Sequence, residues 1–188
     1  MAKKKLVVGI TGMPGSGKSL AVRVAKEKGY DVVVMGDVIR EEAEKRSLDP
    51  NPKNIGKIML ELRYMEGTNV IAQRCIPKIE KTRRQKVIVD GIRSLKEVAE
   101  FREHFPKFSL IAIHSCPETR FKRLYKRRRS DDAANRDIFN ERDMRELSVG
   151  LGSAIALAEH VIINEEPAGV VKDKIKKVLE KVEKKWTK

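Results

Sequence analysis

Near its start the chain reads Gly12-Met13-Pro14-Gly15-Ser16-Gly17-Lys18-Ser19, directly after the apolar run Leu6–Ile10. This segment has the spacing G-x-x-x-x-G-K-S, in which the glycines allow a tight turn and let backbone N–H groups approach an anion. An amphipathic stretch from Leu20 to Lys28 follows, so we expect a strand, a turn and a helix in succession. Helix N-termini attract phosphate groups. The segment therefore predicts a phosphate-binding loop (P-loop) and a chain that binds nucleoside triphosphates.

The P-loop pattern predicts how ATP is held. Lys18 is expected to reach the outer phosphates and to be catalytic, while the Ser19 hydroxyl is placed to bind Mg²⁺. An apolar run at 87–89 leads into Asp90, as expected for a second Mg²⁺-organising group. We therefore predict ATP and Mg²⁺ as cofactors. The residues expected to bind ATP are Gly12, Met13, Pro14, Gly15, Ser16, Gly17, Lys18, Ser19 and Asn164.

The composition indicates one domain of ordinary size, residues 1–188. The chain is 40% hydrophobic and 36% charged, which is typical of a soluble globular protein. No apolar stretch approaches the ~20 residues of a membrane-spanning helix, and the run after the basic start Met1–Lys5 is too short for an export signal. Two cysteines without metal-type spacing and three isolated histidines argue against zinc. We expect a cytoplasmic protein that does not contact membranes.

Short β-branched runs alternate with helical patterns along the chain, which is typical of a parallel sheet covered by helices. The expected strands are Leu6–Ile10, Val32–Met35, Val87–Val89, Leu110–His114 and Val161–Ile163. We found no internal repeat. The predicted fold class is therefore α/β, a P-loop NTPase with a five-stranded parallel sheet flanked by helices.

The long segment between the second and third expected strands, about residues 37–82, is expected to be a helical insert that binds an acceptor. Ligands of open parallel sheets collect beyond the carboxyl ends of the strands. Asp37 and Arg40 follow the second strand, about one helical turn apart, and Arg93 follows the third. Arg63 lies on a helix of the insert. We predict Asp37, Arg40, Arg63 and Arg93 as acceptor-binding residues.

A second functional segment is expected at about residues 120–142, after the fourth strand. Its first helix has arginines that recur every three or four residues and share one face, Arg123 among them. Arg129 and Arg142 follow. Arginines on a hinged segment can close over phosphates, exclude water and neutralise charge in a transition state. We predict a lid here, with Arg123, Arg129 and Arg142 as catalytic residues.

Three of these elements resemble motifs of the adenylate kinases. Gly36-Asp37-x-x-Arg40 resembles their G-D-x-x-R element, and Asp90-Gly91-Ile92-Arg93 resembles D-G-F-P-R shortened by one residue. Arg129-x-Asp131-Asp132 with the later Arg142 resembles their R-x-D-D…R lid. From Arg129 to Asn164 the chain is similar to an archaeal-type family of adenylate-kinase-related P-loop proteins, which itself resembles dephospho-coenzyme A kinase.

The resemblance implies a nucleoside monophosphate kinase-like fold and an enzyme that moves the γ-phosphoryl group of ATP to a nucleoside monophosphate or similar small nucleotide. Its partners would be small-molecule nucleotide substrates. A phosphate acceptor is already anionic and needs no base, whereas a hydroxyl acceptor needs a carboxylate within hydrogen-bond reach. The arginines favour a phosphate acceptor. The sequence does not predict an oligomeric state.

Two alternatives stay open at this point. Asp37 could act as the catalytic base of a dephospho-coenzyme A kinase-like enzyme, which transfers phosphate to a ribose hydroxyl. A P-loop ATPase switch associated with nucleic acid is the alternative from another class, because the net charge is +14 and basic residues cluster from Lys122 to Arg129. That helix has few aromatic side chains on which bases could stack, so we consider nucleic acid an improbable partner.

Overall fold

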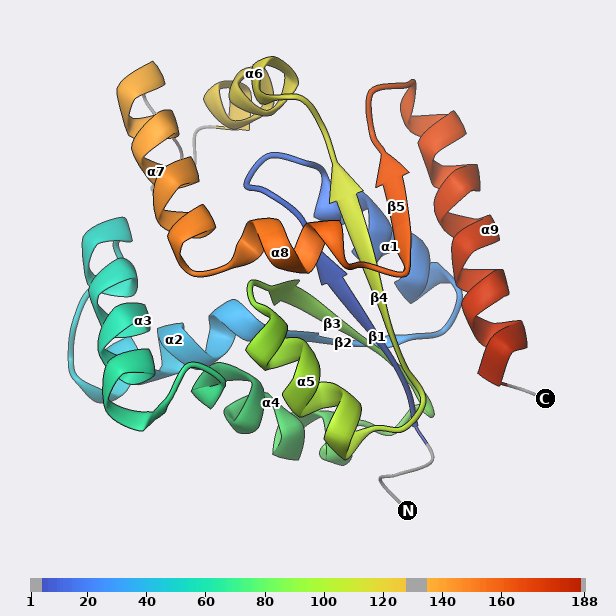
Figure 1. Cartoon of the computed structure of the whole chain (residues 1–188), viewed down its shortest axis with the longest axis horizontal. Helices are drawn as coiled ribbons and strands as arrows, with labels where there is room; N and C mark the ends of the chain where they lie inside the picture. The colour runs from blue at the N-terminus through green and yellow to red at the C-terminus, as the bar shows by residue number, and fades with distance from the viewer. Residues whose placement is uncertain (1–4, 128–134, 187–188) are drawn as a thin grey trace.

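A computed structural model describes residues 5–127 and 135–186 and contains a five-stranded parallel sheet between two layers of helices (Figure 1). The strands are β1 (Leu6–Thr11), β2 (Asp31–Val34), β3 (Lys86–Ile92), β4 (Phe108–His114) and β5 (His160–Ile163). Their order across the sheet is β2-β3-β1-β4-β5. The five strands expected from the sequence are confirmed, and their ends differ from the expected ones by at most three residues.

Helices connect the strands and cover both faces of the sheet (Figure 1). Those in the described residues are α1 (Lys18–Glu27), α2 (Met35–Lys45), α3 (Pro52–Glu66), α4 (Val70–Lys81), α5 (Leu95–His104), α6 (Pro117–Arg127), α7 (Arg136–Ser148), α8 (Leu151–Ala156) and α9 (Ala168–Trp186). The segment predicted as an insert consists of α2, α3 and α4. The segment predicted as a lid spans α6, residues outside the described ranges, and part of α7.

Strand β1 lies at the centre of the sheet and all six of its residues are buried. Val8 packs with the helices α1 and α9 on one face, and Val7 packs with the insert helices and α5 on the other. A strand covered on both faces reads as a continuous apolar run rather than as an alternating one. This is why the first five apolar residues of β1 were readable from the sequence.

The carboxyl ends of β1, β3 and β4 meet at one edge of the sheet because the three strands are parallel neighbours. Asp90 was expected to follow the third strand, but it lies within β3, opposite Ile10 of β1. The register of this pair shifts just afterwards, where Gly91 adopts a φ of 104° that favours glycine. The pairing with Ile10 places Asp90 one residue before the end of β1, close to the turn that follows.

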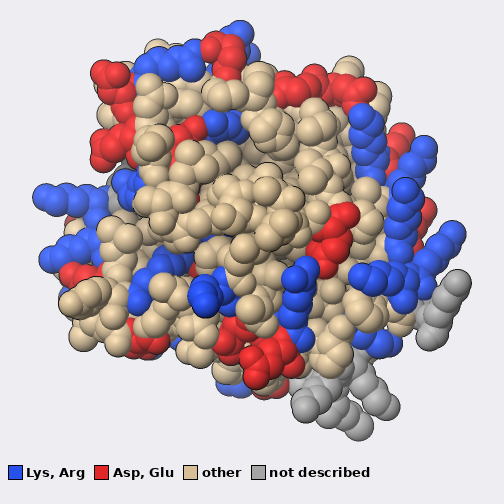
Figure 2. Space-filling model, viewed as in Figure 1, with Lys and Arg blue, Asp and Glu red and all other residues tan. Residues whose placement is uncertain are grey.

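Charged side chains are spread over the face of the molecule seen in Figure 2. Lys and Arg are interspersed with Asp and Glu around its rim, and its centre, over α8, is largely uncharged. Ion pairs between exposed or partly exposed side chains include Lys172–Glu27 and Lys28–Glu180, which join the C-terminal end of α1 to α9. Among residues 5–127 and 135–186, every helix is too short or too polar to cross a bilayer.

Candidate active site

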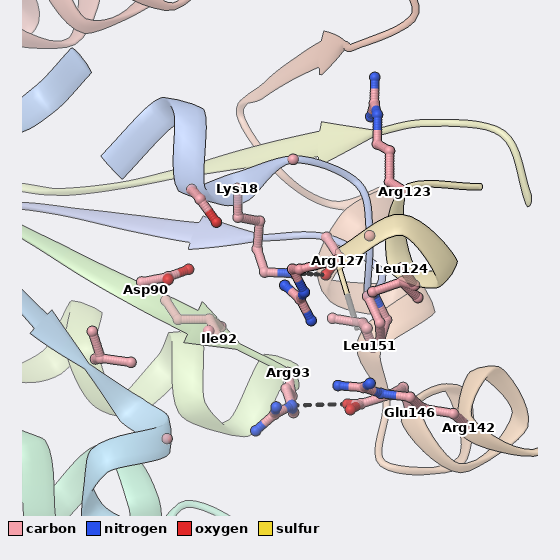
Figure 3. Close-up of a pocket in the computed structure, with 18 of the residues that line it drawn as sticks. Lys18, Asp90, Ile92, Arg93, Arg123, Leu124, Arg127, Arg142, Glu146 and Leu151 are labelled. Atoms are coloured by element: carbon pink, nitrogen blue, oxygen red, sulfur yellow. Dashed lines mark hydrogen bonds and ion pairs between the residues drawn. The ribbon is translucent and has the colours of Figure 1, made fainter. Parts of the chain in front are cut away.

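A pocket of about 320 Å³ opens at the carboxyl edge of the sheet (Figure 3). The P-loop, the ends of β2 and β3, and residues of α6, α7 and α8 form its walls. Its charged lining residues are Lys18, Arg40, Asp90, Arg93, Arg123, Arg127, Arg142 and Glu146. Six basic residues thus line the pocket against two acidic ones, and this excess of positive charge suits a site for polyanions.

The P-loop needs its glycines for backbone shape and for space. Gly12, Gly15 and Gly17 have φ angles of 144°, 79° and 95°, which are unfavourable for residues with a side chain. A Cβ atom on Gly12 would lie 2.3 Å from the Ile113 carbonyl oxygen, and one on Gly17 would lie 2.0 Å from Asn164 Nδ2. The loop therefore fits against β4 and the end of β5 only because these positions carry no side chain.

The carbonyl oxygens of the P-loop are bound by donors from the protein. Lys18 Nζ donates to the Gly12 carbonyl at 2.6 Å, and Arg120 Nη1 donates to the Pro14 carbonyl at 3.1 Å. Helix α1 begins at Lys18 with no side-chain cap and no acidic residue in its first turn. The first N–H groups of a helix have no intrahelical partner. The loop and helix can thus offer several N–H donors to one phosphate group.

Asn164 braces the P-loop from behind. Its Nδ2 donates to the Ser16 carbonyl at 2.8 Å, and its own carbonyl accepts bonds from Ser115 Oγ at 2.8 Å and Arg123 Nη2 at 2.9 Å. Asn164 is buried and is not among the lining residues of the pocket. The structure therefore places Asn164 where it fixes the loop that holds phosphate, rather than in the pocket where the sequence led us to expect a contact with ATP.

Arg123 shares this bracing arrangement. Its Nη1 donates to Ser115 Oγ at 2.8 Å, and Figure 3 shows the side chain pointing away from Lys18 and Arg127. In this conformation the Arg123 guanidinium binds the P-loop and its neighbours. It does not point into the space where a phosphoryl group would be transferred. Arg127 and Arg142 also line the pocket. Arg129, the third arginine predicted for catalysis, lies outside the described residues.

Burial dominates the electrostatics of Lys18. Desolvation lowers the pKa of its ammonium group from 10.5 to about 8, with Arg93 and Arg142 acting in the same direction and Asp90 opposing them. Burial likewise raises the pKa of the Asp90 carboxyl, against the cations Lys18 and Arg93. The two groups lie at the same end of the pocket (Figure 3).

Asp90 and Ser19 fit a Mg²⁺ ion. Asp90 Oδ1 is buried and, within the described residues, accepts no hydrogen bond, so it keeps an oxygen for a ligand that the protein does not supply. Ser19 lines the same pocket. The described residues hold no group of three or more His, Cys, Asp or Glu side chains of the kind that binds metal alone. Mg²⁺ commonly uses only one or two carboxylates, because substrate phosphates and water complete its octahedron.

Arg40 and Arg93 also line the pocket. Arg40 binds Asp37 through Nη1 and Oδ1 at 2.5 Å, and both side chains are about half exposed. Arg40 lines the pocket, whereas Asp37 is not among its lining residues. Arg93 Nε lies 2.8 Å from Glu146 Oε2, a contact drawn as a dashed line in Figure 3. The structure brings together three of the side chains predicted from separate motifs: Arg40, Arg93 and Arg142.

Arg63, also predicted to bind the acceptor, is placed elsewhere. Its side chain is 9% exposed, and its Nη2 donates to Glu97 Oε1 on α5 at 2.7 Å. Glu97 is fully buried, and its Oε2 accepts the backbone N–H of Arg93 at 2.7 Å. Arg63 is not among the pocket's lining residues, so we remove it from the acceptor-binding set. Arg63 is linked to Arg93 only through Glu97. The buried guanidinium of Arg63 needs an opposite charge, and Glu97 on α5 supplies it.

Two helices of the predicted lid segment are joined by a buried ion pair. Arg120 on α6 binds Asp143 on α7 through two bonds, Nη1–Oδ1 at 2.8 Å and Nη2–Oδ2 at 2.5 Å. The Arg120 guanidinium also stacks over Phe139, 4.9 Å from the ring centroid. Such bidentate pairs fix geometry as well as charge. The pair links α7, which carries Arg142, to the P-loop carbonyl that Arg120 binds.

The sequence interpretation missed Glu146 and Glu97 as members of the site. Glu146 follows Arg142 by four residues, so both lie on one face of α7, and that spacing was a usable signal. Glu97 lies in the first turn of α5, where an acidic residue is usually explained by the helix dipole. Nothing in its local sequence indicated contact with Arg63, which is 34 positions away.

The buried pair Arg63–Glu97 predicts a large effect on stability. Arg63→Met should lower the free energy of unfolding by about 3–5 kcal/mol, because Glu97 would be left as an unpaired buried charge. Arg74→Met is the matched control on the insert, since Arg74 is 31% exposed with partners Glu42 and Glu66, and should cost about 1 kcal/mol or less. Urea unfolding measures both values. Equal costs would contradict the assignment.

The lowered pKa of Lys18 predicts a pH dependence of ligand binding. Affinity for Mg·ATP should be constant up to about pH 8 and fall above it, because the ammonium loses its proton. In the absence of ligand, unfolding takes up a proton between about pH 8 and 10.5, so this group's contribution to the free energy of unfolding rises with pH there. Calorimetric titration from pH 7 to 10 measures the affinity.

Lys18→Arg is the control for this titration, because a guanidinium stays charged throughout that range. The fall in affinity above pH 8 should be absent from this variant. The same fall in both proteins would show that another group titrates.

Comparisons with known proteins identify the family of the chain. Residues 11–145 match the family model described as the AAA domain. A UPF0200 protein of Methanocaldococcus jannaschii is 52% identical over 163 residues, which cover 86% of this chain and 82% of that protein. A UPF0200 protein of Methanothermobacter thermautotrophicus is 42% identical over 177 residues, covering 94% and 90%.

Solved structures share the fold at low sequence identity. TT1252 from Thermus thermophilus superposes with a TM-score of 0.65 at 17% identity, over 95% of this chain and 98% of that one. Shikimate kinase from Acinetobacter baumannii, in complex with shikimate, gives 0.58 at 12% identity over 97% and 96%. The predicted fold class is confirmed, and the chain belongs to the UPF0200 protein family, with an AAA domain and a P-loop kinase-like fold.

Proposed function

We propose that this protein is a kinase that transfers the γ-phosphoryl group of ATP to a phosphate group of a nucleoside monophosphate or similar small nucleotide. One observation carries the proposal. One pocket is lined both by the P-loop with Lys18 and Asp90 and by the arginines Arg40 and Arg93 that follow β2 and β3. The kinase-like fold supports phosphoryl transfer.

The donor end would bind the ATP phosphates through backbone N–H groups and Lys18. Lys18 then exchanges its contacts with the Gly12 and Met13 carbonyls for phosphate oxygens. When bound, Mg²⁺ would be held by Ser19 and Asp90 and would neutralise charge on the transferring phosphoryl group. A buried ammonium favours such a ligand, because an adjacent anion restores the charged form that burial disfavours.

The acceptor end would bind a second phosphate through Arg40 and Arg93. Two polyphosphates repel each other, so an enzyme that joins them must supply positive charge between them. Arg142, from α7, reaches the same pocket and would complete this charge. We propose that α6 and α7 act as the lid, with Arg127 and Arg142 nearest the transferred group. Arg129 stays a predicted member of this set.

The alternative with a hydroxyl acceptor is less well supported. Its proposed base, Asp37, is bound to Arg40 at 2.5 Å and does not line the pocket. A base must be within hydrogen-bond reach of the proton that it removes. An ion-paired carboxylate outside the lining therefore suits a role in orienting Arg40 better than one in proton transfer.

The alternative with nucleic acid loses much of its basis in α6. The net charge and the basic residues of this helix were its support. In the structure Arg120 binds Asp143, Arg123 binds Ser115, and Lys122 lies 3.7 Å from Glu118. These side chains have partners within the protein, so they offer less charge to a phosphodiester backbone. Salt-dependent nucleic-acid binding would reverse this ranking.

A substrate panel tests the acceptor class. Purified protein is incubated with Mg·ATP and, separately, with each nucleoside monophosphate and with dephospho-coenzyme A, and the products are identified by mass. We expect a nucleoside diphosphate. Phosphorylated dephospho-coenzyme A would establish the hydroxyl alternative, and ADP with no phosphorylated product would favour an ATPase.

Loss of Lys18 predicts a loss of transfer. Lys18→Ala should lower kcat by about a hundred- to a thousandfold, in line with about 3–4 kcal/mol of lost transition-state stabilisation. Lys26→Ala is the control, because Lys26 is an exposed lysine on the same helix, and it should leave the rate unchanged. Initial rates with the acceptor from the panel measure both. Near-normal transfer by Lys18→Ala would refute the site.

A further inference from the structure

Arg93, the arginine proposed to bind the acceptor, is held at its backbone by Glu97 and at its side chain by Glu146. Its backbone N–H donates to Glu97 Oε2 at 2.7 Å, and Glu97 is held in turn by Arg63 and by its position in the first turn of α5, where Ser94 Oγ accepts the Glu97 N–H. These bonds fix the backbone of Arg93. They leave the torsions of its long side chain undetermined, so the direction of the guanidinium must be set by something else.

We propose that Glu146 is a positioning residue that directs the guanidinium of Arg93 toward the acceptor phosphate. This inference rests on the proposed function for the role of Arg93. Glu146 Oε2 lies 2.8 Å from Arg93 Nε, and the two side chains are 7% and 25% exposed. Glu146 comes from α7 and Arg93 from the turn after β3, so the contact crosses the pocket between two separate elements (Figure 3).

The surroundings of Glu146 keep it ionised. Burial acts to raise the pKa of its carboxyl, but Arg93, Arg142 and Lys18 outweigh this effect and the pKa is lowered. Glu146 in turn is the main cause that raises the pKa of Arg93. Both groups are therefore charged near neutral pH, and the contact is an ion pair between a buried carboxylate and a guanidinium that is about three-quarters buried.

A carboxylate on the wall of a pocket for anions repels the ligand, so its presence needs a compensating gain. An arginine has five N–H donors and can keep one carboxylate contact while it binds phosphate through others. Holding the guanidinium in place before binding avoids the entropy of ordering a long side chain when the acceptor arrives. We infer that this preorganisation of Arg93 outweighs the repulsion from Glu146.

The contact also connects the acceptor site to the lid segment. Arg142 lies one helical turn before Glu146 on α7 and lines the same pocket. A displacement of α7 therefore moves Arg142 and the carboxylate that directs Arg93 together. The acceptor arginine and the lid arginine are thereby placed by one helix.

Glu146→Gln tests the proposal, because it removes the charge and keeps the size of the side chain. Glu141→Gln is the matched control, since Glu141 is exposed on the same helix. The first readout is the ¹⁵Nε–H resonance of Arg93 by NMR, assigned with Arg93→Met. We expect a resonance from an ordered Arg93 in the wild type and in Glu141→Gln, and a shift or loss in Glu146→Gln. This readout needs no acceptor.

The second readout is kinetic and uses the nucleoside monophosphate that the wild type phosphorylates best. Glu146→Gln should raise KM for this acceptor about tenfold and change KM for ATP by less than about twofold. Glu146→Asp, which restores the charge, should recover part of the loss. Urea unfolding checks that each variant is folded, and Glu146→Ala, which also removes the charge, serves as the test variant if Glu146→Gln is not.

The outcomes separate this inference from the proposed function. If Arg93→Met raises the acceptor KM but Glu146→Gln does not, Arg93 binds the acceptor and Glu146 does not position it. If Arg93→Met leaves the acceptor KM unchanged, Arg93 does not bind the acceptor, and if no acceptor in the panel is phosphorylated, the proposed function is wrong. In both cases the NMR readout alone decides whether Glu146 orders Arg93. An unchanged Arg93 resonance in Glu146→Gln overturns the inference in every case.

Discussion

The carbonyl oxygen of Ser16 is the fixed point of the site. Asn164 Nδ2, Ser115 Oγ and Arg123 Nη1 approach it at 2.8, 3.2 and 3.4 Å, from the ends of β5 and β4 and from α6. Because these donors bind the Ser16 carbonyl, and Lys18 binds the Gly12 carbonyl, the loop can turn its N–H groups toward a ligand. A loop free to rotate its peptides would have to be ordered by each phosphate that arrives. This bracing therefore supplies the preorganisation on which the electrostatics of the pocket depend.

Much of the fold could be predicted from the sequence because two of its requirements are local. Strands buried on both faces must be apolar throughout, so β1 and β4 stand out as runs. Glycines at 12, 15 and 17 are needed for backbone shape, so the P-loop also stands out. The end of β3 was misjudged because a register shift at Gly91 is decided by the neighbouring strand. The residues around Asp90 do not reveal how β3 pairs with β1. We therefore expected Asp90 after the strand rather than within it.

The site was predicted less completely, since a side chain's role depends on a partner far away in the chain. Arg63 and Arg40 look alike in sequence, yet one is buried against Glu97 and the other lines the pocket. Strand-end reasoning placed Asn164 at the correct edge of the sheet. It could not tell which side of the P-loop the amide would face. That choice follows from the absence of a side chain at Gly17, whose Cβ would collide with Asn164 Nδ2.

The two carboxylates of the pocket follow from the number of its cations. Six basic residues line about 320 Å³ and repel one another, and burial of Lys18, with Arg93 and Arg142 nearby, lowers its pKa to about 8. Asp90 and Glu146 reduce that repulsion while the chain has no ligand bound. Asp90 keeps an oxygen for a metal, and Glu146 holds Arg93. A pocket without them would attract phosphates more strongly at long range. It would also hold its cations less firmly in place, and phosphoryl transfer depends on placement as much as on charge.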